Sequence, residues 1–227
     1  MTIWGKSIPD QWFESYCAPS DEAAQDFKNI NLLANILTRS SQVQFKIPSF
    51  NVRWGDPCRF LAGLTEVTVP SLIIDIGTSC GGSAKTFLHS SQFFHKKSNI
   101  VTFDIIPWNA FQGTYLEEKD FSSGRIVQYV EDLSNIKIFE KHQNLLAFAD
   151  LIYCDGPKDG VFEYVFLDRL SKLKMSQKQR FLVLDDIRFQ NMAALWRDIA
   201  SPKFDATSFA HWSGTGFIDI SEGLKLK

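Results

Sequence analysis

Two acidic motifs in the second half of the chain have the residue types of a cation site. The first motif, YCDGPKDG, contains Asp155 and Lys158, and the second, LVLDD, ends in Asp185 and Asp186. Each carboxylate follows a short apolar run of the kind that forms a buried strand. Carboxylates gathered at neighbouring strand ends repel one another unless a cation neutralises them, and their oxygens suit Mg²⁺ or a similar divalent ion. We therefore expect Asp155, Asp185 and Asp186 to bind a metal ion; the alternative is that they cap surface turns.

A glycine-rich segment, LIIDIGTSCGGS, predicts a second site. An apolar run ends in Asp75, glycines follow, and a helical pattern begins near Ser83. Strand, glycine-rich turn and helix in this order begin a nucleotide-binding α/β unit. Glycines allow a tight turn and close approach of a ligand, and the helix start offers free N–H groups. We expect Asp75, Gly77, Gly81 and Ser83 to contact a cofactor; the alternative is a purely structural corner.

Asp104 ends the apolar run VTFD, 29 residues after Asp75. A carboxylate at the end of the second strand can accept both hydroxyls of a ribose. We expect Asp104 to bind the ribose of a nucleoside, with a simple turn cap as the alternative.

From Ser71 onward, short apolar runs alternate with helical patterns, which predicts a parallel sheet covered on both faces. The tail differs, because two strand-like runs, 204–212 and 216–220, are joined by SGT and predict an antiparallel hairpin. The other predicted strands are 72–76, 100–104, 125–130, 150–154 and 181–185, and the predicted helices are 85–95, 136–144, 161–173 and 191–199.

Residues 1–70 have a different pattern from residues 71–227, the predicted catalytic domain. A helical apolar pattern spans residues 21–38 after Ser20, a plausible N-cap, and the sequence then loosens into IPSFNVRWGDPCRF. We expect residues 1–70 to form a helical cap or lid with an irregular loop.

The overall composition excludes several classes of protein. A formal net charge of −2 provides no basic field for nucleic acid or an anionic membrane. The four cysteines form no C-x-x-C pair, so zinc-site spacing is absent. No stretch approaches the roughly 18 apolar residues of a membrane span. We expect a soluble, cytoplasmic protein that acts on a small molecule, with a homo-oligomer left open.

The motifs together resemble those of class I S-adenosylmethionine-dependent methyltransferases, and in particular the metal-dependent O-methyltransferases. The pattern D-x-G-x-x-x-G-G-S resembles the first motif of that class. Catechol and caffeoyl-CoA O-methyltransferases have D-x-x-K followed by Asp-Asn, and macrocin-type sugar O-methyltransferases have an Asp followed by Asp-Asp. This chain has D-G-P-K and then Asp185-Asp186, and its HWSGTGFID resembles the last hairpin of bacterial members. The resemblance covers roughly residues 70–221.

The resemblance implies a Rossmann-like, seven-stranded α/β methyltransferase sheet with S-adenosylmethionine and Mg²⁺ as cofactors. It places Asp132 near the adenine amino group, with Glu131 and Ser134 as alternatives. It implies methyl transfer to a hydroxyl of a small molecule or sugar. A bound cation would lower the pKa of Lys158 and make its amine a general base, with His211 as the alternative base.

Three other functions compete with this hypothesis. A metal-independent methyltransferase would use the same donor. An NAD(P)-dependent Rossmann oxidoreductase is disfavoured, because the glycine motif lacks the second glycine of G-x-G-x-x-G and a terminal hairpin is unlike that fold. A non-catalytic scaffold would have no use for a carboxylate cluster that costs stability.

Overall fold

The computed structural model describes residues 2–3, 6–7, 30–46, 55–94, 97–175, 178–210 and 212–227. Its main sheet has seven strands in the order β5-β4-β3-β6-β7-β9-β8. Five strands of this sheet, β3 to β7, are parallel, whereas β9 runs antiparallel between β7 and β8. The strands are β3 (Leu72–Ile76), β4 (Asn99–Asp104), β5 (Ile126–Val130), β6 (Leu151–Cys154), β7 (Phe181–Asp185), β8 (Lys203–Asp205) and β9 (Thr215–Asp219), and a separate pair is formed by β1 (Thr2–Ile3) and β2 (Lys6–Ser7).

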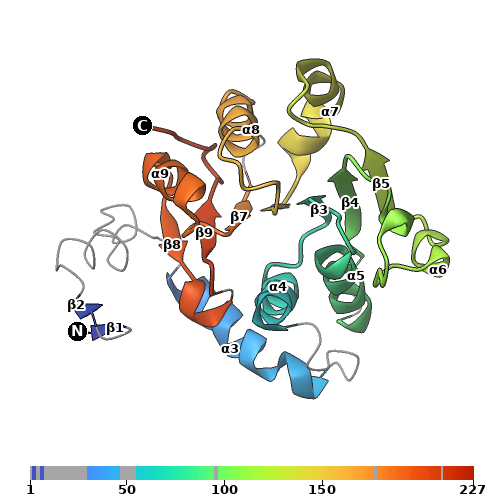
Figure 1. Cartoon of the computed structure of the whole chain (residues 1–227). Helices are drawn as coiled ribbons and strands as arrows, with labels where there is room; N and C mark the ends of the chain where they lie inside the picture. Colours follow the sequence, from blue (N-terminus) through green and yellow to red (C-terminus); the bar gives the residue numbers. More distant parts are fainter. Residues whose placement is uncertain are drawn as a thin grey trace.

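Helices cover both faces of the sheet (Figure 1). On one face lie α3 (Ile30–Lys46), α4 (Gly55–Thr68) and α5 (Gly82–Phe93), and on the other lie α7 (Ile136–Phe148), α8 (Phe162–Ser171) and α9 (Gln190–Asp198). The short α6 (Glu118–Phe121) and the 3₁₀ turns η1 (Trp108–Ala110) and η2 (Thr207–Phe209) lie in connections. This three-layer arrangement explains why the central strands are apolar on both sides.

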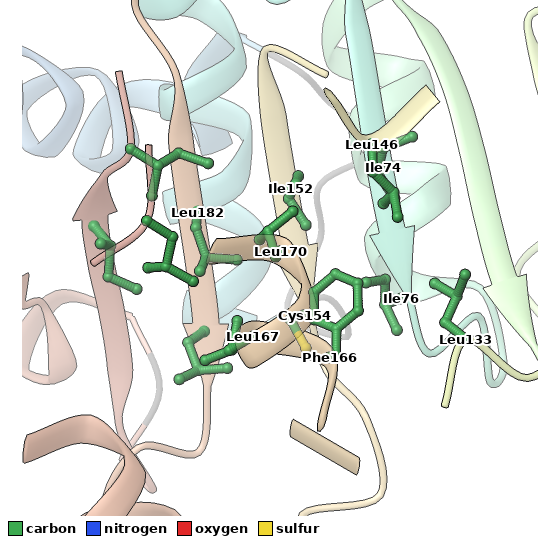
Figure 2. Packing of buried hydrophobic residues seen from close by; sticks show 14 of the residues in the cluster. Ile74, Ile76, Leu133, Leu146, Ile152, Cys154, Phe166, Leu167, Leu170 and Leu182 are labelled. Atoms are coloured by element: carbon green, nitrogen blue, oxygen red, sulfur yellow. The ribbon is translucent and has the colours of Figure 1, made fainter. Parts of the chain in front are cut away.

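Alternate residues of each central strand face opposite layers, as the two-residue period of a strand requires. Ile74, Ile152 and Leu182 pack with α7 and α8 in one cluster (Figure 2). Their neighbours Ile73, Leu151, Tyr153, Phe181 and Val183 belong to a second cluster, which includes buried residues of α3, α4 and α5. Helices α3 and α4 therefore share one hydrophobic core with the sheet.

Most of the predicted elements are present with small shifts of their ends. All five predicted parallel strands exist, and the ends of the four predicted helices lie within four residues of their predicted positions. The antiparallel hairpin is also confirmed. Of the N-terminal helix predicted over 21–38, residues 30–38 are helical and the helix continues to Lys46, whereas residues 21–29 lie outside the described part of the chain.

Two sequence predictions were wrong. The first strand of the hairpin is not 204–212, because β8 ends at Asp205, whose side chain accepts the backbone N–H of Thr207 at 3.0 Å and turns the chain into η2. The segment GDPCRF is not an irregular loop, since it opens helix α4. Its Pro57 is compatible with a first helical turn, where no intrahelical N–H bond is lost. Among the described residues, no helix is both long and apolar enough to cross a bilayer.

Candidate active site

A cavity of about 630 Å³ opens at the carboxyl ends of the parallel strands. In doubly wound sheets this edge is where ligands bind. The loops after β3, β4, β5 and β6 form its walls. Its lining includes Gly77, Ser79, Asp104, Ile106, Glu131, Asp132, Ser134, Asp155, Lys158 and Phe162. The structure thus brings Gly77, Asp104 and Asp132 of the predicted cofactor site together with the first acidic motif.

Asp104 connects two of these loops. Its Oδ2 accepts the backbone N–H of Ser79 at 2.8 Å, and its Oδ1 accepts that of Ile106 at 3.0 Å. The carboxylate is half-buried and lines the cavity. The two backbone donors fix the orientation of the carboxylate, and its remaining lone pairs are available to further donors.

The next strand end carries a pair of carboxylates with different partners. Asp132 accepts both the backbone N–H and the hydroxyl of Ser134, each at 2.7 Å, and is exposed. Glu131 bonds to Nε2 of His142 at 2.6 Å and to Nζ of Lys141. Lys141 and His142 hold the pKa of Glu131 below its usual range. Glu131, Asp132 and Ser134 all line the cavity, so Glu131 and Ser134 remain alternatives to Asp132 as the predicted contact to adenine.

Asp75, Gly81 and Ser83 lie beneath the cavity and do not line it. Asp75 is fully buried, and its Oδ2 accepts the hydroxyl of Thr102 at 2.8 Å. Burial raises the pKa of Asp75 to about 7, and the Ser83 and Thr102 hydroxyls lower it only in part. Gly81 is buried at the N-cap of α5 with a φ of 81°, where a Cβ would lie 2.4 Å from the Leu116 side chain. These residues shape the turn from below.

The three aspartates of the two acidic motifs converge beside the cavity. One carboxylate oxygen from each of Asp155, Asp185 and Asp186 lies within 4.8 Å of the others. Asp155 is partly exposed, and the other two are buried. Burial raises the pKa of Asp185 to about 8, with the charges of Asp155 and Asp186 adding to the effect. Oxygen ligands at this spacing, with mutual repulsion to relieve, fit a hard divalent cation.

The backbone and neighbouring strands hold these carboxylates in place. Asp185 completes β7 and is paired in register with Thr215 of β9. Asp186 has a φ of 57° and accepts the hydroxyl of Ser213, from the segment before β9. The phenol of Tyr153 lies 3.4 Å from Oδ2 of Asp155. The antiparallel insertion of β9 therefore supports the cluster from one side.

Lys158 joins the cavity to the cluster. Its Nζ bonds to Oδ1 of Asp155 and lies 3.1 Å from Oδ2 of Asp186, with the side chain 16% exposed. Burial by itself lowers the pKa of Lys158, but Asp155 and then Asp186 raise it, so the pKa lies above its ordinary value. In this arrangement the amine is a cation. Lys158 can therefore accept a proton only when another cation balances the negative charge of the three aspartates.

Glu163 is a site residue that the sequence analysis did not identify. It is fully buried at the start of α8, where Oε1 accepts the N–H of Lys158 at 2.8 Å and Oε2 accepts that of Gly160 at 3.1 Å. The φ of Lys158 is 60°, a left-handed conformation that is uncommon for a residue with a side chain. No sequence pattern marks this role, because it rests on two contacts with backbone N–H groups. His211, the alternative base, lies outside the described residues.

Comparison with known proteins identifies the fold. No family model matches the sequence, and no curated protein sequence matches it significantly. Solved structures do match. A methyltransferase from Podospora anserina, PaMTH1, bound to S-adenosylhomocysteine, is 16% identical with a TM-score of 0.50, covering 92% of this chain and 97% of its own. CalS11, a TDP-rhamnose 3′-O-methyltransferase of calicheamicin biosynthesis, is 13% identical with a TM-score of 0.52, covering 87% and 93%.

This is the class I methyltransferase fold. The parallel strands and the antiparallel β9 between β7 and β8 agree with the sheet that the sequence resemblance implied. An apo structure of CmcI, 13% identical with a TM-score of 0.51 over 72% of this chain and 70% of its own, matches as well. The methyltransferase fold places the cavity and the acidic cluster next to each other at one edge of the sheet.

Proposed function

We propose that this protein is an S-adenosylmethionine-dependent O-methyltransferase that acts on a hydroxyl of a small molecule or sugar with the help of a divalent ion. The observation that carries the proposal is the shared boundary of the cavity and the acidic cluster. Asp155 lines the cavity and is one of the three aspartates of the cluster. Lys158 also lines the cavity, and it pairs with two of those aspartates. A donor in the cavity and an acceptor at the cluster would therefore meet. Methyl transfer requires that contact, because the nucleophile must approach the sulfonium methyl in line.

The donor half of the site rests on the loops after β3, β4 and β5. Asp104 would accept the ribose hydroxyls, because its carboxylate lines the cavity and two backbone N–H groups fix its orientation. Asp132 or Ser134 would contact the adenine, and Gly77 leaves room for the rest of the donor. Asp75, Gly81 and Ser83 would support the turn from beneath rather than contact the donor.

The acceptor half rests on the acidic cluster and Lys158. A divalent ion held by Asp155, Asp185 and Asp186 would supply Lewis-acid activation of the acceptor hydroxyl. Lys158 would take the hydroxyl proton at Nζ, since it lies next to the cluster without being one of its oxygen ligands. Glu163 would keep the Lys158 backbone in place during that transfer.

Isothermal titration calorimetry with S-adenosylhomocysteine tests the donor half. We expect Asp104→Ala to lose roughly tenfold or more in affinity, because charge-assisted hydrogen bonds contribute about 1.5–3 kcal/mol each. Asp104→Asn is an intermediate comparison, since it loses the charge and keeps one acceptor oxygen for only one of the two backbone N–H groups. Unchanged affinity in Asp104→Ala would refute the ribose assignment, and binding of NADH in preference to S-adenosylhomocysteine would favour an oxidoreductase.

Activity in a chelator separates the metal-dependent proposal from a metal-independent methyltransferase. We expect EDTA to abolish methyl transfer to the acceptor hydroxyl and excess Mg²⁺ to restore it. Full activity in EDTA would remove the metal from the mechanism while leaving the donor assignment intact.

A further inference from the structure

The ammonium of Lys158 pairs with two of the three carboxylates that could hold a cation. Its Nζ bonds to Oδ1 of Asp155 and lies 3.1 Å from Oδ2 of Asp186, so it bridges two carboxylates of the cluster. Asp155 and Asp186 come from different strand ends, and Lys158 is the residue that holds them together electrostatically. A lysine that merely stood near the site would contact one carboxylate or neither.

The backbone around Lys158 is fixed while its side chain is long. Glu163 binds the N–H groups of Lys158 and Gly160, and Asn191 donates to the carbonyl of Lys158 at 3.4 Å. The loop therefore cannot carry the amine away by moving as a whole. The four-carbon side chain can still rotate, because it is flexible and its ammonium is a compact charge.

We propose that Lys158 is a built-in competitor of the divalent cation: its ammonium neutralises Asp155 and Asp186 in the metal-free protein and must leave these oxygens when the metal binds. The inference rests on the metal site of the proposed function. Metal binding is then coupled to release of the Lys158 amine toward the acceptor. The apparent metal affinity is reduced by the fraction of molecules in which the ammonium blocks the site.

Titration of Mg²⁺ alone into wild type and Lys158→Met by calorimetry tests the competition. Methionine keeps much of the side-chain length and removes the charge. We expect Lys158→Met to bind Mg²⁺ at least roughly tenfold more tightly, because a unit charge this close to two ligand oxygens interacts strongly with them. Equal or weaker binding by Lys158→Met would overturn the proposal, as would binding by neither protein.

Arg188→Met is the matched control for a simple loss of positive charge. Arg188 lies two residues from Asp186, but its guanidinium bonds to Asp205 at 2.9 Å rather than to the cluster. We expect its Mg²⁺ affinity to stay within about twofold of wild type, because its charge is already paired with Asp205 and is partly exposed to screening by salt. An increase as large as that of Lys158→Met would show a general field effect and refute direct competition.

A second measurement follows the amine itself. Acetylation of Lys158 by dilute acetic anhydride, quantified by mass spectrometry, should increase severalfold when Mg²⁺ is added to wild type. Lys172, which pairs with Asp168 on the surface, is the internal control and should not change. A Lys158 rate that does not respond to bound Mg²⁺ would contradict release. Neither measurement requires a donor or acceptor, so a failure of methyl transfer and a failure of competition are distinguishable.

Discussion

Asp75 is a carboxylate that the fold keeps away from water. It is the fourth of the five residues of β3, just before the glycine-rich turn, and its pKa is raised to about 7 from 3.8, chiefly by burial. Because the folded protein holds the proton more tightly than the unfolded chain, stability from this group is greatest below pH 3.8 and declines until pH exceeds about 7. Each pKa unit is worth about 1.4 kcal/mol, so the total cost at neutral pH approaches about 4 kcal/mol.

Asp75→Asn should remove this pH dependence. Relative to wild type, its free energy of unfolding should rise by up to about 4 kcal/mol between pH 4 and pH 7.5, because asparagine carries no charge to bury. Urea denaturation at a series of pH values measures the difference, in which any pH-independent effect of the amide cancels. A difference between the two proteins that stays constant with pH would show that Asp75 ionises freely in the folded state.

Lys158 provides a second test at the scale of one residue. Lys158→Ala should lower kcat by roughly 10²–10⁴-fold, as loss of a general base does. S-adenosylmethionine affinity should remain nearly unchanged, because the proposed contacts to the donor come from the loops after β3, β4 and β5. Lys158→Arg should not restore turnover, since guanidinium stays protonated. Near-wild-type turnover of the arginine variant would make Lys158 an electrostatic group only.

At the scale of elements, the ends of β3 and β6 are in unusually close contact. A Cβ on Gly77 would lie 2.0 Å from the carbonyl oxygen of Asp155, and Gly77 has a φ of 95°. Any side chain at residue 77 therefore pushes the end of β6, and with it the first carboxylate of the acidic cluster. This contact therefore links Gly77, in the donor half of the proposed site, to Asp155, in its acceptor half.

Gly77→Ala should weaken both Mg²⁺ and S-adenosylhomocysteine binding, measured by calorimetry, and should cost more stability than conformational strain alone. Gly113→Ala is the matched control. Gly113 also has a positive φ, 71°, but nothing lies within 4 Å of its Cβ position. The control should lose only about 1 kcal/mol and keep both affinities. Equal effects of the two substitutions would mean that the contact with Asp155 is unimportant.

The sequence predicted elements well where the apolar period was uninterrupted, and it failed where side chains redirect the backbone. The runs that became β3, β4, β6 and β7 are largely apolar on both faces, as strands between two helical layers are. The turn at Asp205 depends on a local side-chain bond, and α4 opens with Gly-Asp-Pro, residues that are typical of a loop. The convergence of Asp155, Asp185 and Asp186 followed from strand ends, whereas the role of Glu163 follows from two backbone contacts that spacing does not reveal.

At the scale of the molecule, helices α3 and α4 contribute to the core. Leu33, Ile36, Phe60 and Leu64 are buried in the same cluster as Phe87 and Phe217. A fragment beginning at residue 71 would expose the sheet face that α3 and α4 cover. The N-terminal helices are therefore structural partners of the sheet as well as a cap over it.

We expect the fragment 71–227 to lack a cooperative thermal transition and to bind a hydrophobic dye, because each exposed large apolar side chain loses about 1.5–3 kcal/mol of burial. Circular dichroism and dye fluorescence, compared with the full chain, measure this. A cooperative transition at a temperature close to that of the full chain would show that residues 71–227 form an independent domain.

The place of β9 in the sheet sets an order of events during synthesis on the ribosome. The cavity is lined by residues 76–162, all of which are translated before β9, whereas the Ser213 contact to Asp186 and the pairing of β7 with β9 come later. A nascent chain can therefore form its donor cavity while one edge of β7 is still unpaired. Such an open edge is a site of misassociation. A ligand captured early in that cavity would stabilise the half-finished sheet until its last strand arrives.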